Sequence, residues 1–294
     1  MIRERFAPSP TGLLHLGHAY SALLTWDNAT VNGGKFLLRI EDIDTPRCKP
    51  EFEQAIFQDL EWLGIKWEKP ALRQSNRQEF YKKTIQRLWG DNKLFACTCT
   101  RKDIQIASAP QEGGTTILGP DGIVYPGTCH PSGVNSNNDP IPPNHALRLS
   151  MSNVLSNLST SNTDRPIFTF AENGFGPRGE TGEIAITAKD LQTNIGDIII
   201  ARKDIGISYH LAVVLDDAYQ GITHITRGQD LFEATKIHVV LQKLLGLPTP
   251  IYHHHKLIRD ENGNRLAKRY DAMAIRKYRA DGASPQDIRK MVGL

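Results

Sequence analysis

The sequence lacks the marks of several protein classes. Four cysteines in 294 residues are too few for the disulfide framework of a small secreted domain. No run approaches the roughly 18 consecutive apolar residues that span a bilayer, and the first residues contain no apolar core of a secretion signal. Basic and acidic side chains nearly balance, 35 against 32, which excludes a strongly basic nucleic-acid arm. We therefore expect a cytoplasmic protein without a membrane segment.

What the sequence does contain is a strand–helix–strand pattern at its start. We predict a strand at residues 2–6, a helix from about 14 to 30 with apolar residues three and four apart, and a buried strand at 35–40. Such a unit implies a parallel sheet with a right-handed crossover. Further helices are predicted at 51–63, 76–92, 211–218 and 233–245.

The composition changes at Cys97. From there to about residue 190 the chain is rich in Gly, Pro, Ser and Asn, and segments 132–138 and 150–163 are polar enough to be loops or disordered. Apolar runs return at 166–170 and 196–201. We therefore predict an α/β domain formed by residues 1–96 and 191–294, split by a loop-rich α+β insertion at 97–190.

The segment His15-Leu16-Gly17-His18 follows a Pro-Ser-Pro-Thr-Gly turn and begins the first predicted helix. A helix amino terminus favours anions, two histidines three residues apart share one helix face, and a glycine lets a ligand approach the backbone. This arrangement suits a polyphosphate nucleotide. Two ordinary surface histidines on an amphipathic helix are the alternative.

Together with Arg5–Gly12, this segment resembles the amino-terminal signature of the class I glutamyl- and glutaminyl-tRNA synthetases. Leu38–Thr45, Tyr209–Asp217 and Ile225–Leu231 resemble later signatures of that family, and residues 265–269 stand where it has its Lys-Met-Ser-Lys-Ser-type loop. The resemblance implies a class I, Rossmann-like catalytic domain with a parallel sheet. It is close over residues 1–100 and 190–294, and only loose between them.

No anticodon-binding domain follows Leu294, so the sequence is identified as a member of the truncated glutamyl-Q tRNA(Asp) synthetase family. The resemblance implies ATP-dependent activation of L-glutamate and its transfer to the queuosine base of tRNA(Asp), by a monomer. A conventional synthetase that charges a tRNA 3′ end and a non-catalytic RNA-binding paralogue are the alternatives. From Lys256 onward, 10 basic residues face 5 acidic ones, which suits RNA phosphates or an ordinary solvated surface.

Glutamate presents two carboxylates and one ammonium group, so its site needs cations of fixed geometry and one acid. Arg5 and Arg227 can bind carboxylates in bidentate fashion, and Glu41 can pair with the ammonium, with Ser9 as a hydrogen-bond partner. The resemblance implies that these four residues and Tyr209 form the glutamate site. Glutamine lacks the negative side-chain charge that would offset the free-energy cost of burying both arginines, so glutamate is the expected substrate.

The same resemblance implies that His15, Gly17 and His18 bind ATP, that Lys268 closes over its phosphates, and that Mg²⁺ accompanies the nucleotide. His15, His18 and Lys268 are the predicted catalytic residues. Ala267 replaces the serine that usually precedes this lysine, a loss expected to slow activation without abolishing it. Two further patterns, His238 and His253-His254-His255, are interpreted as an ordinary helix residue and as the alternating end of a strand.

Cys97 and Cys99, with Cys129 further along, can supply thiolates to a structural Zn²⁺, which leaves a tetrahedral site one ligand short. The resemblance implies that Tyr125 completes it, although the neighbouring His130 is chemically the better donor. Three thiols without a metal are the alternative.

Overall fold

The computed structural model describes residues 1–109, 115–130, 139–156, 163–204, 206–258 and 273–294. The predicted strand–helix–strand unit at the start is confirmed. Strand β1 (Arg3–Phe6) pairs in parallel with β2 (Lys35–Ile40), and helix α1 (Leu16–Val31) connects them. Strand β2 also pairs in parallel with β3 (Glu68–Arg73), which the sequence analysis did not predict.

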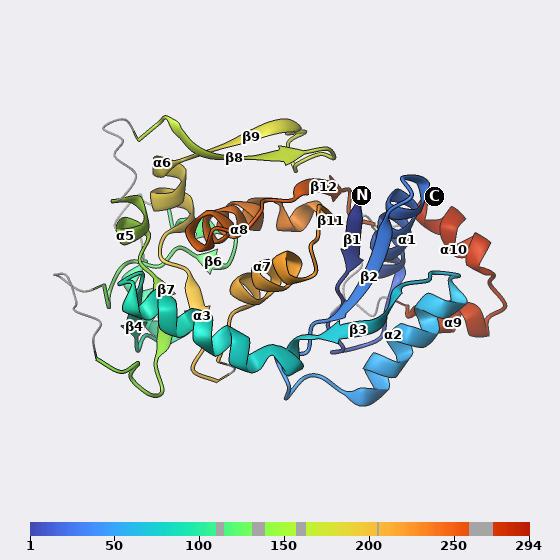
Figure 1. The fold of residues 1–294 in the computed structure, drawn as a ribbon, viewed down its shortest axis with the longest axis horizontal. Helices are drawn as coiled ribbons and strands as arrows, with labels where there is room; N and C mark the ends of the chain where they lie inside the picture. Colours follow the sequence, from blue (N-terminus) through green and yellow to red (C-terminus); the bar gives the residue numbers. More distant parts are fainter. Residues whose placement is uncertain (110–114, 131–138, 157–162, 205, 259–272) are drawn as a thin grey trace.

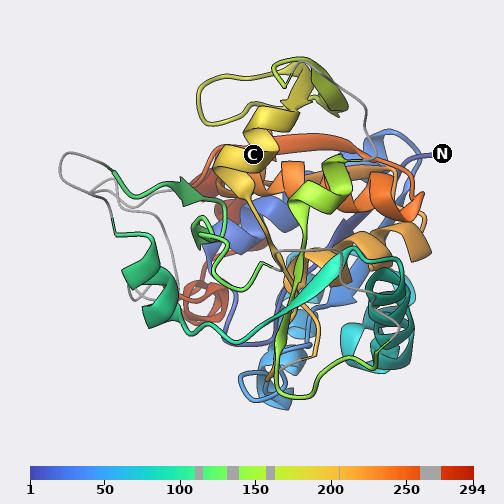
Figure 2. The ribbon, with the colours of Figure 1, turned by 90° about the vertical axis from the view of Figure 1, so that its left-hand side faces the viewer.

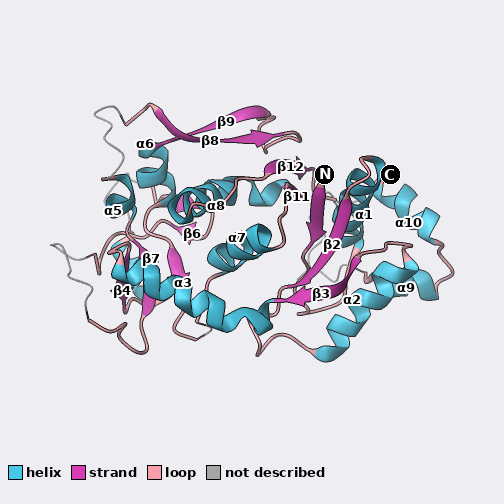
Figure 3. Ribbon diagram, in the orientation of Figure 1, coloured by secondary structure: helices cyan, strands magenta, loops and turns pink. Residues whose placement is uncertain are grey.

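The second half of the chain repeats this alternation. Helix α7 (Tyr209–Tyr219) leads to β11 (His224–Gly228), and α8 (Phe232–Leu245) leads to β12 (Ile251–His255), which pairs in parallel with β11. Helices α7 and α8 lie within a few residues of their predicted positions, because their apolar periodicity is strong, whereas no strand was predicted at β11. Figures 1 and 3 show α7 and α8 between the strands β1 to β3 and the insertion.

The two halves meet where β1 lies beside β11 (Figure 1). The backbone N–H of Thr223 donates to the carbonyl of Arg3 at 3.0 Å, and the Thr226 hydroxyl donates to the Glu4 carboxylate at 2.8 Å. Helix α10 (Pro285–Val292) returns to α1, where Arg289 forms two hydrogen bonds of 2.8 Å with Asp27. Elements from both ends of the chain thus contribute to the parallel α/β fold, and the division into 1–96, 97–190 and 191–294 stays a prediction.

A second small sheet joins the insertion to the segments that flank it: β7 (Ala146–Leu149) pairs antiparallel with β4 (Leu94–Cys97) and β10 (Ile199–Ala201), which lie almost wholly outside residues 97–190. Figure 2 shows α4 (Arg101–Ala107) projecting from the body of the molecule. The hairpin of β8 (Pro166–Glu172) and β9 (Gly182–Thr187) joins the catalytic sheet instead, through the pair Glu172 and Tyr252. The strands that the structure describes in segment 97–190 are thus divided among three sheets, the third being the two-stranded pair of β5 (Leu118–Gly119) and β6 (Gly122–Ile123).

The prediction that 150–163 is loop or disordered is wrong over helix α5 (Met151–Leu155). The Ser150 hydroxyl caps this helix by accepting the N–H of Asn153 at 3.3 Å, and Met151, Val154 and Leu155 are buried. Tertiary burial of three apolar side chains outweighs the polar composition of the segment.

The remaining elements complete the description: α2 (Pro50–Trp62), α3 (Gln78–Gly90) after the short turn η1 (Gln74–Arg77), β5 (Leu118–Gly119), β6 (Gly122–Ile123), α6 (Ala188–Asp190), η2 (Leu191–Ile195), η3 (Gln229–Leu231) and α9 (Ile275–Ala280). No helix among the described residues has the length and apolarity needed to cross a bilayer.

Candidate active site and metal centre

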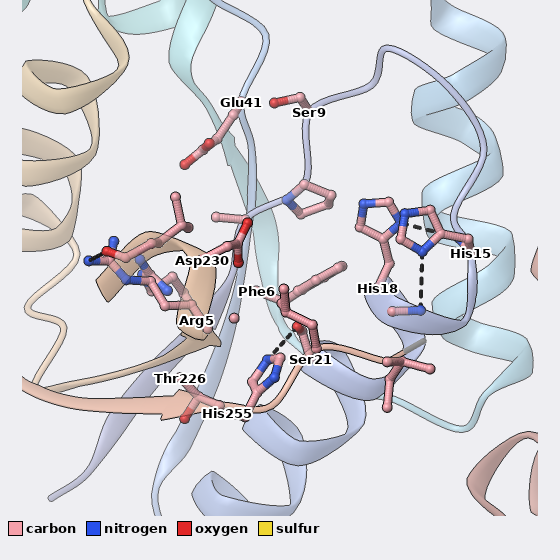
Figure 4. Close-up of a pocket in the computed structure, with 18 of the residues that line it drawn as sticks. Arg5, Phe6, Ser9, His15, His18, Ser21, Glu41, Thr226, Asp230 and His255 are labelled. Atoms are coloured by element: carbon pink, nitrogen blue, oxygen red, sulfur yellow. Dashed lines mark hydrogen bonds between the residues drawn. The ribbon is translucent and has the colours of Figure 1, made fainter. Parts of the chain in front are cut away.

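A cavity of about 460 Å³ opens at the carboxyl ends of β1, β2 and β11, where the two halves of the domain meet. Ligands of open parallel sheets bind at such strand ends. The cavity is lined by every predicted nucleotide and glutamate residue that the structure describes (Figure 4): Arg5, Ser9, His15, Gly17, His18, Glu41, Tyr209 and Arg227. Lys268 lies outside the described residues.

At one end of the cavity, His15 and His18 cap the first turn of α1 (Figure 4). Nδ1 of His15 accepts the backbone N–H of Gly17, and Nδ1 of His18 accepts that of His15, each at 3.1 Å. A neutral ring that accepts through Nδ1 carries its proton on Nε2, where it can donate to a phosphate oxygen. A Cβ at Gly17 would lie 3.0 Å from the His15 ring, so a larger residue here would push against the capping histidine.

At the other end, two arginines share one carboxylate. Nε of Arg5 donates to Asp217 at 2.8 Å, and Nη1 of Arg39 donates to the same oxygen at 2.7 Å. Burial raises the pKa of Asp217, but the two arginines outweigh it and hold this pKa below its usual value. Nη2 of Arg39 donates to Glu41 at 3.1 Å. Burial raises the pKa of Glu41 against the opposing charges of Arg39 and Arg5, so these two cations and two carboxylates cancel in charge only while Glu41 is ionised.

Tyr209, the first residue of α7, lies against this charged cluster. Burial, followed by the nearby Glu41 carboxylate, raises the pKa of its phenol to about 12. The hydroxyl therefore stays protonated at neutral pH and can donate a hydrogen bond to a bound ligand.

Arg227, on β11, differs from Arg5 in its partners. Its Nη2 donates to the Thr235 hydroxyl at 2.6 Å and to the carbonyl of residue 231. Its Nε donates to His254 and its Nη1 to His238, each at 3.1 Å. None of these acceptors is a carboxylate. The cavity therefore keeps one buried positive charge that no described side chain neutralises directly.

The interpretation of His238 as an ordinary helix residue is wrong, because its ring is buried and accepts from Arg227. The alternation predicted for the three consecutive histidines is confirmed: His254 contacts Arg227 and Glu172, whereas His255 contacts Ser21 (Figure 4). The sequence analysis also assigned no role to Asp217. The signal available was an acidic residue at the end of an apolar helical run, which implies a buried charged partner.

The three cysteines of the insertion gather within 4.8 Å of one another. A tetrahedron with zinc–sulfur bonds of about 2.3 Å places its sulfurs about 3.8 Å apart, and its sulfur and oxygen ligands about 3.5 Å apart. Here Sγ of Cys99 lies 3.4 Å from that of Cys129, and the Tyr125 hydroxyl lies 3.5 Å from the sulfurs of both Cys97 and Cys99. The donor set thus has dimensions that fit a zinc ion.

The surroundings of the cluster favour an anionic ligand at Cys129, whereas burial raises the pKa of the Cys99 thiol and of the Tyr125 phenol. Burial raises the pKa of Cys129, but hydrogen bonds from Tyr125 and Thr98 outweigh it and lower this pKa to about 6. Arg148 donates to the sulfur of Cys97 at 3.4 Å, and its charge can offset the excess of three thiolates over a divalent ion. The His130 ring instead bonds Ser150 at 3.1 Å.

Comparison with known proteins agrees with this geometry. The family model for the catalytic domain of class I tRNA synthetases (E and Q) matches residues 1–116 and 181–294. The glutamyl-Q tRNA(Asp) synthetase of Rhodobacter capsulatus is 54% identical over 99% of both chains, and that of Symbiobacterium thermophilum is 36% identical over 98% of this chain and 84% of its own.

Solved structures extend the comparison to the fold. A glutamate tRNA ligase from Elizabethkingia meningosepticum, in complex with its amino acid, aligns with a TM-score of 0.71 and 25% identity over the whole chain. The chain spans 60% of that ligase. The methionyl-tRNA synthetase of Mycobacterium tuberculosis, at 11% identity and a TM-score of 0.53, shares the fold alone. The chain is a ligase that belongs to the class I tRNA synthetases of the glutamyl and glutaminyl type and, within them, to the glutamyl-Q tRNA(Asp) synthetase family.

Proposed function

We propose that the protein activates L-glutamate with ATP and transfers it to the queuosine base of tRNA(Asp). The observation that carries the first step is the cavity itself, which has a histidine pair at a helix amino terminus at one end and buried arginines at the other (Figure 4). The choice of queuosine in tRNA(Asp) as the acceptor rests on the names of the relatives.

In the first step, an oxygen of the glutamate α-carboxylate attacks the α-phosphorus of ATP. The bond from this phosphorus to the bridging oxygen breaks, pyrophosphate leaves, and glutamyl-adenylate forms. No protein nucleophile is needed, because positioning and charge stabilisation lower the barrier. His15, His18 and the backbone at Gly17 bind the phosphates in this scheme, Lys268 stabilises the departing charge, and Mg²⁺ accompanies the nucleotide.

Charge favours glutamate over glutamine. Arg5 and Arg39 are balanced by Asp217 and Glu41, whereas Arg227 is bonded to neutral acceptors. The cavity therefore offers one buried guanidinium with no directly bonded carboxylate, which can pair with a carboxylate of glutamate. Glutamine would leave the buried arginine without a counter-charge, which is costly. In our proposal Arg5 and Arg227 contact the carboxylates, Glu41 and Ser9 contact the ammonium group, and Tyr209 closes the site.

In the second step, a hydroxyl of the queuosine ring attacks the glutamyl carbonyl, AMP leaves, and an ester forms. We further propose that Cys97, Cys99, Cys129 and Tyr125 hold a structural Zn²⁺. This ion fixes the base of the projecting helix α4 rather than taking part in the chemistry.

The test is transfer of labelled glutamate, with ATP, to tRNA(Asp) carrying or lacking queuosine, with tRNA(Glu) alongside. Labelling of the queuosine form alone is the expected result. Labelling of tRNA(Glu) would make the protein a short conventional synthetase. No labelling and no glutamate-dependent ATP–pyrophosphate exchange would leave an RNA-binding paralogue.

The role of Lys268 has a separate test. Lys268→Ala should abolish adenylate formation while leaving thermal unfolding unchanged, because its predicted contact is with ATP alone. Lys102→Ala, an exposed lysine on α4, is the matched control and should keep wild-type exchange. Exchange that survives in Lys268→Ala would contradict the assignment.

A further inference from the structure

A chain of hydrogen bonds runs from the insertion to Arg227. The carboxylate of Asp121 lies 2.8 and 3.0 Å from Nε2 of His210, Nδ1 of His210 lies 3.0 Å from Nε2 of His238, and Nδ1 of His238 lies 3.1 Å from Nη1 of Arg227. Both imidazoles and the guanidinium are buried, while Asp121 is half-exposed. The chain thus begins near the surface of the insertion and ends in the cavity.

The two ends of this chain fix the direction of every bond within it. Arginine has only donors, so Nδ1 of His238 must accept and the proton of this ring lies on Nε2. That proton is donated to Nδ1 of His210, whose own proton must then lie on Nε2. An ionised aspartate only accepts, so Asp121 is the partner that this arrangement requires. Replacing Asp121 by a hydrogen-bond donor would favour the opposite tautomers of His210 and His238. Nδ1 of His238 would then carry a proton and could no longer accept from Arg227.

The pKa of His238 agrees with a neutral ring. Burial, followed by the charge of Arg227, lowers the pKa of His238 well below its usual value. Burial raises the pKa of Asp121, but the hydrogen bonds from His210 outweigh it and lower this pKa. The ring of His238 is therefore uncharged and the carboxylate ionised at neutral pH.

On its other side, Arg227 is held in the same way by the catalytic sheet. Nε2 of His254 accepts from Arg227, so the proton of this ring lies on Nδ1, which donates to Glu172 at 2.5 Å. The carboxylate of Glu172 is itself fixed by the backbone N–H groups of Gly174 and His254. Two carboxylates, each acting through neutral imidazoles, thus orient the guanidinium without neutralising it by direct contact.

The hairpin that carries Asp121 packs closely against the body of the protein at Gly119. Asp121 lies in the turn between β5 and β6, and a Cβ at Gly119 would come within 2.5 Å of the carbonyl oxygen of Asn194 in η2. The backbone of this hairpin is therefore seated against the body of the protein. The position falls in residues 117–180, which the family model leaves unmatched.

We infer that Asp121 of the insertion is a positioning residue for the glutamate site, which acts through His210 and His238 to orient the Arg227 guanidinium toward a carboxylate of the amino acid. This inference rests on the proposed function, because it assigns the bound carboxylate to glutamate. The nucleotide end of the cavity has no part in the chain, so the effect is specific to the amino acid.

The test is glutamate-dependent ATP–pyrophosphate exchange by the full chain. Asp121→Ala should raise the KM for glutamate about tenfold, the effect of losing one hydrogen bond to a buried group, with kcat within about twofold of wild type. The KM for ATP should not change. Asp121→Asn should fall between wild type and Asp121→Ala, because an amide can satisfy either tautomer of His210. Asp204→Ala, a half-exposed carboxylate paired with Arg202, is the matched control.

A double-mutant cycle separates positioning from general damage. His238→Leu removes the acceptor for Arg227 and should raise the KM for glutamate at least as far as Asp121→Ala. The double variant should then be no worse than His238→Leu alone, because both changes break one chain. Additive effects, an equal rise in the KM for ATP, or a wild-type KM for glutamate in Asp121→Ala would each overturn the inference. Absence of exchange in the wild type would instead refute the proposed function.

Discussion

Glu4 lies on β1 beneath the cavity, with a side chain that is 3% exposed. Burial raises its pKa from 4.5 to about 7, against the smaller opposing effects of the Thr226 hydroxyl and the charge of Arg5. A carboxyl group whose folded pKa is raised stabilises the protein fully below its unfolded pKa, and this contribution is lost as the pH rises through the folded pKa. The protein therefore carries a destabilising ionisation at and above neutral pH.

The perturbation that exposes this cost is Glu4→Gln, which keeps an oxygen to accept the Thr226 hydroxyl but cannot ionise. A rise from 4.5 to about 7 corresponds to roughly 3 kcal/mol. We expect Glu4→Gln to unfold at a free energy up to about 3 kcal/mol higher than wild type at pH 8, and less than about 1 kcal/mol higher at pH 5.

Urea unfolding followed by circular dichroism at both pH values measures this difference. Glu68→Gln is the control, because its half-exposed carboxylate pairs with Lys35 at the surface, where ion pairs contribute little. A stabilisation by Glu4→Gln that is equal at pH 5 and pH 8 would refute the reasoning, since it would show that ionisation of Glu4 is not the cause.

Three further predictions concern the caps, the metal and the packing. His15→Ala removes the helix cap, so it should lower the free energy of unfolding by about 1 kcal/mol and raise the KM for ATP. His15→Asn should keep the cap and still raise this KM. Equal destabilisation by both variants would contradict the capping role. Tyr125→Phe should lower zinc affinity at least tenfold in competition with a chelator, whereas His130→Ala should leave this affinity unchanged. A larger loss of affinity in His130→Ala than in Tyr125→Phe would make His130 the ligand. Gly34→Ala places a Cβ 2.5 Å from a backbone oxygen and should lower the free energy of unfolding in urea by about 1–3 kcal/mol. The control, Gly90→Ala, places a Cβ with no atom within 4 Å and should be tolerated. Equal effects of the two variants would contradict the packing argument.

The elements that the sequence predicted well are those with strong periodicity, such as α1, α8 and β2. Strand β3 (Glu68–Arg73) escaped prediction because it is half polar and contains Pro70, so neither alternation nor apolar content marks it. Its pairing with β2 is a tertiary effect. A local sequence pattern is enough to predict a helix or strand only where that pattern reflects which side chains are buried.

The residues of the cavity could be predicted by resemblance because they lie within contiguous motifs. Their supporting partners could not, since His238 and His254 acquire their roles only when β11, α8 and β12 come together. The same is true of Asp121, whose partner His210 is 89 residues away. Hydrogen-bond direction, which decides what these rings do, has no signature in a single sequence.

The contact between β1 and β11 also affects how the chain folds. The Arg3–Thr223 contacts join residues 220 positions apart, so the ribosome needs roughly 10–40 s to supply the second partner after the first. During that interval the outer edge of β1 has no neighbour, and such an edge is open to pairing with other chains. Nascent chains halted before β11 should therefore be the species most dependent on chaperones, and the cavity becomes competent only after most of the protein has been made.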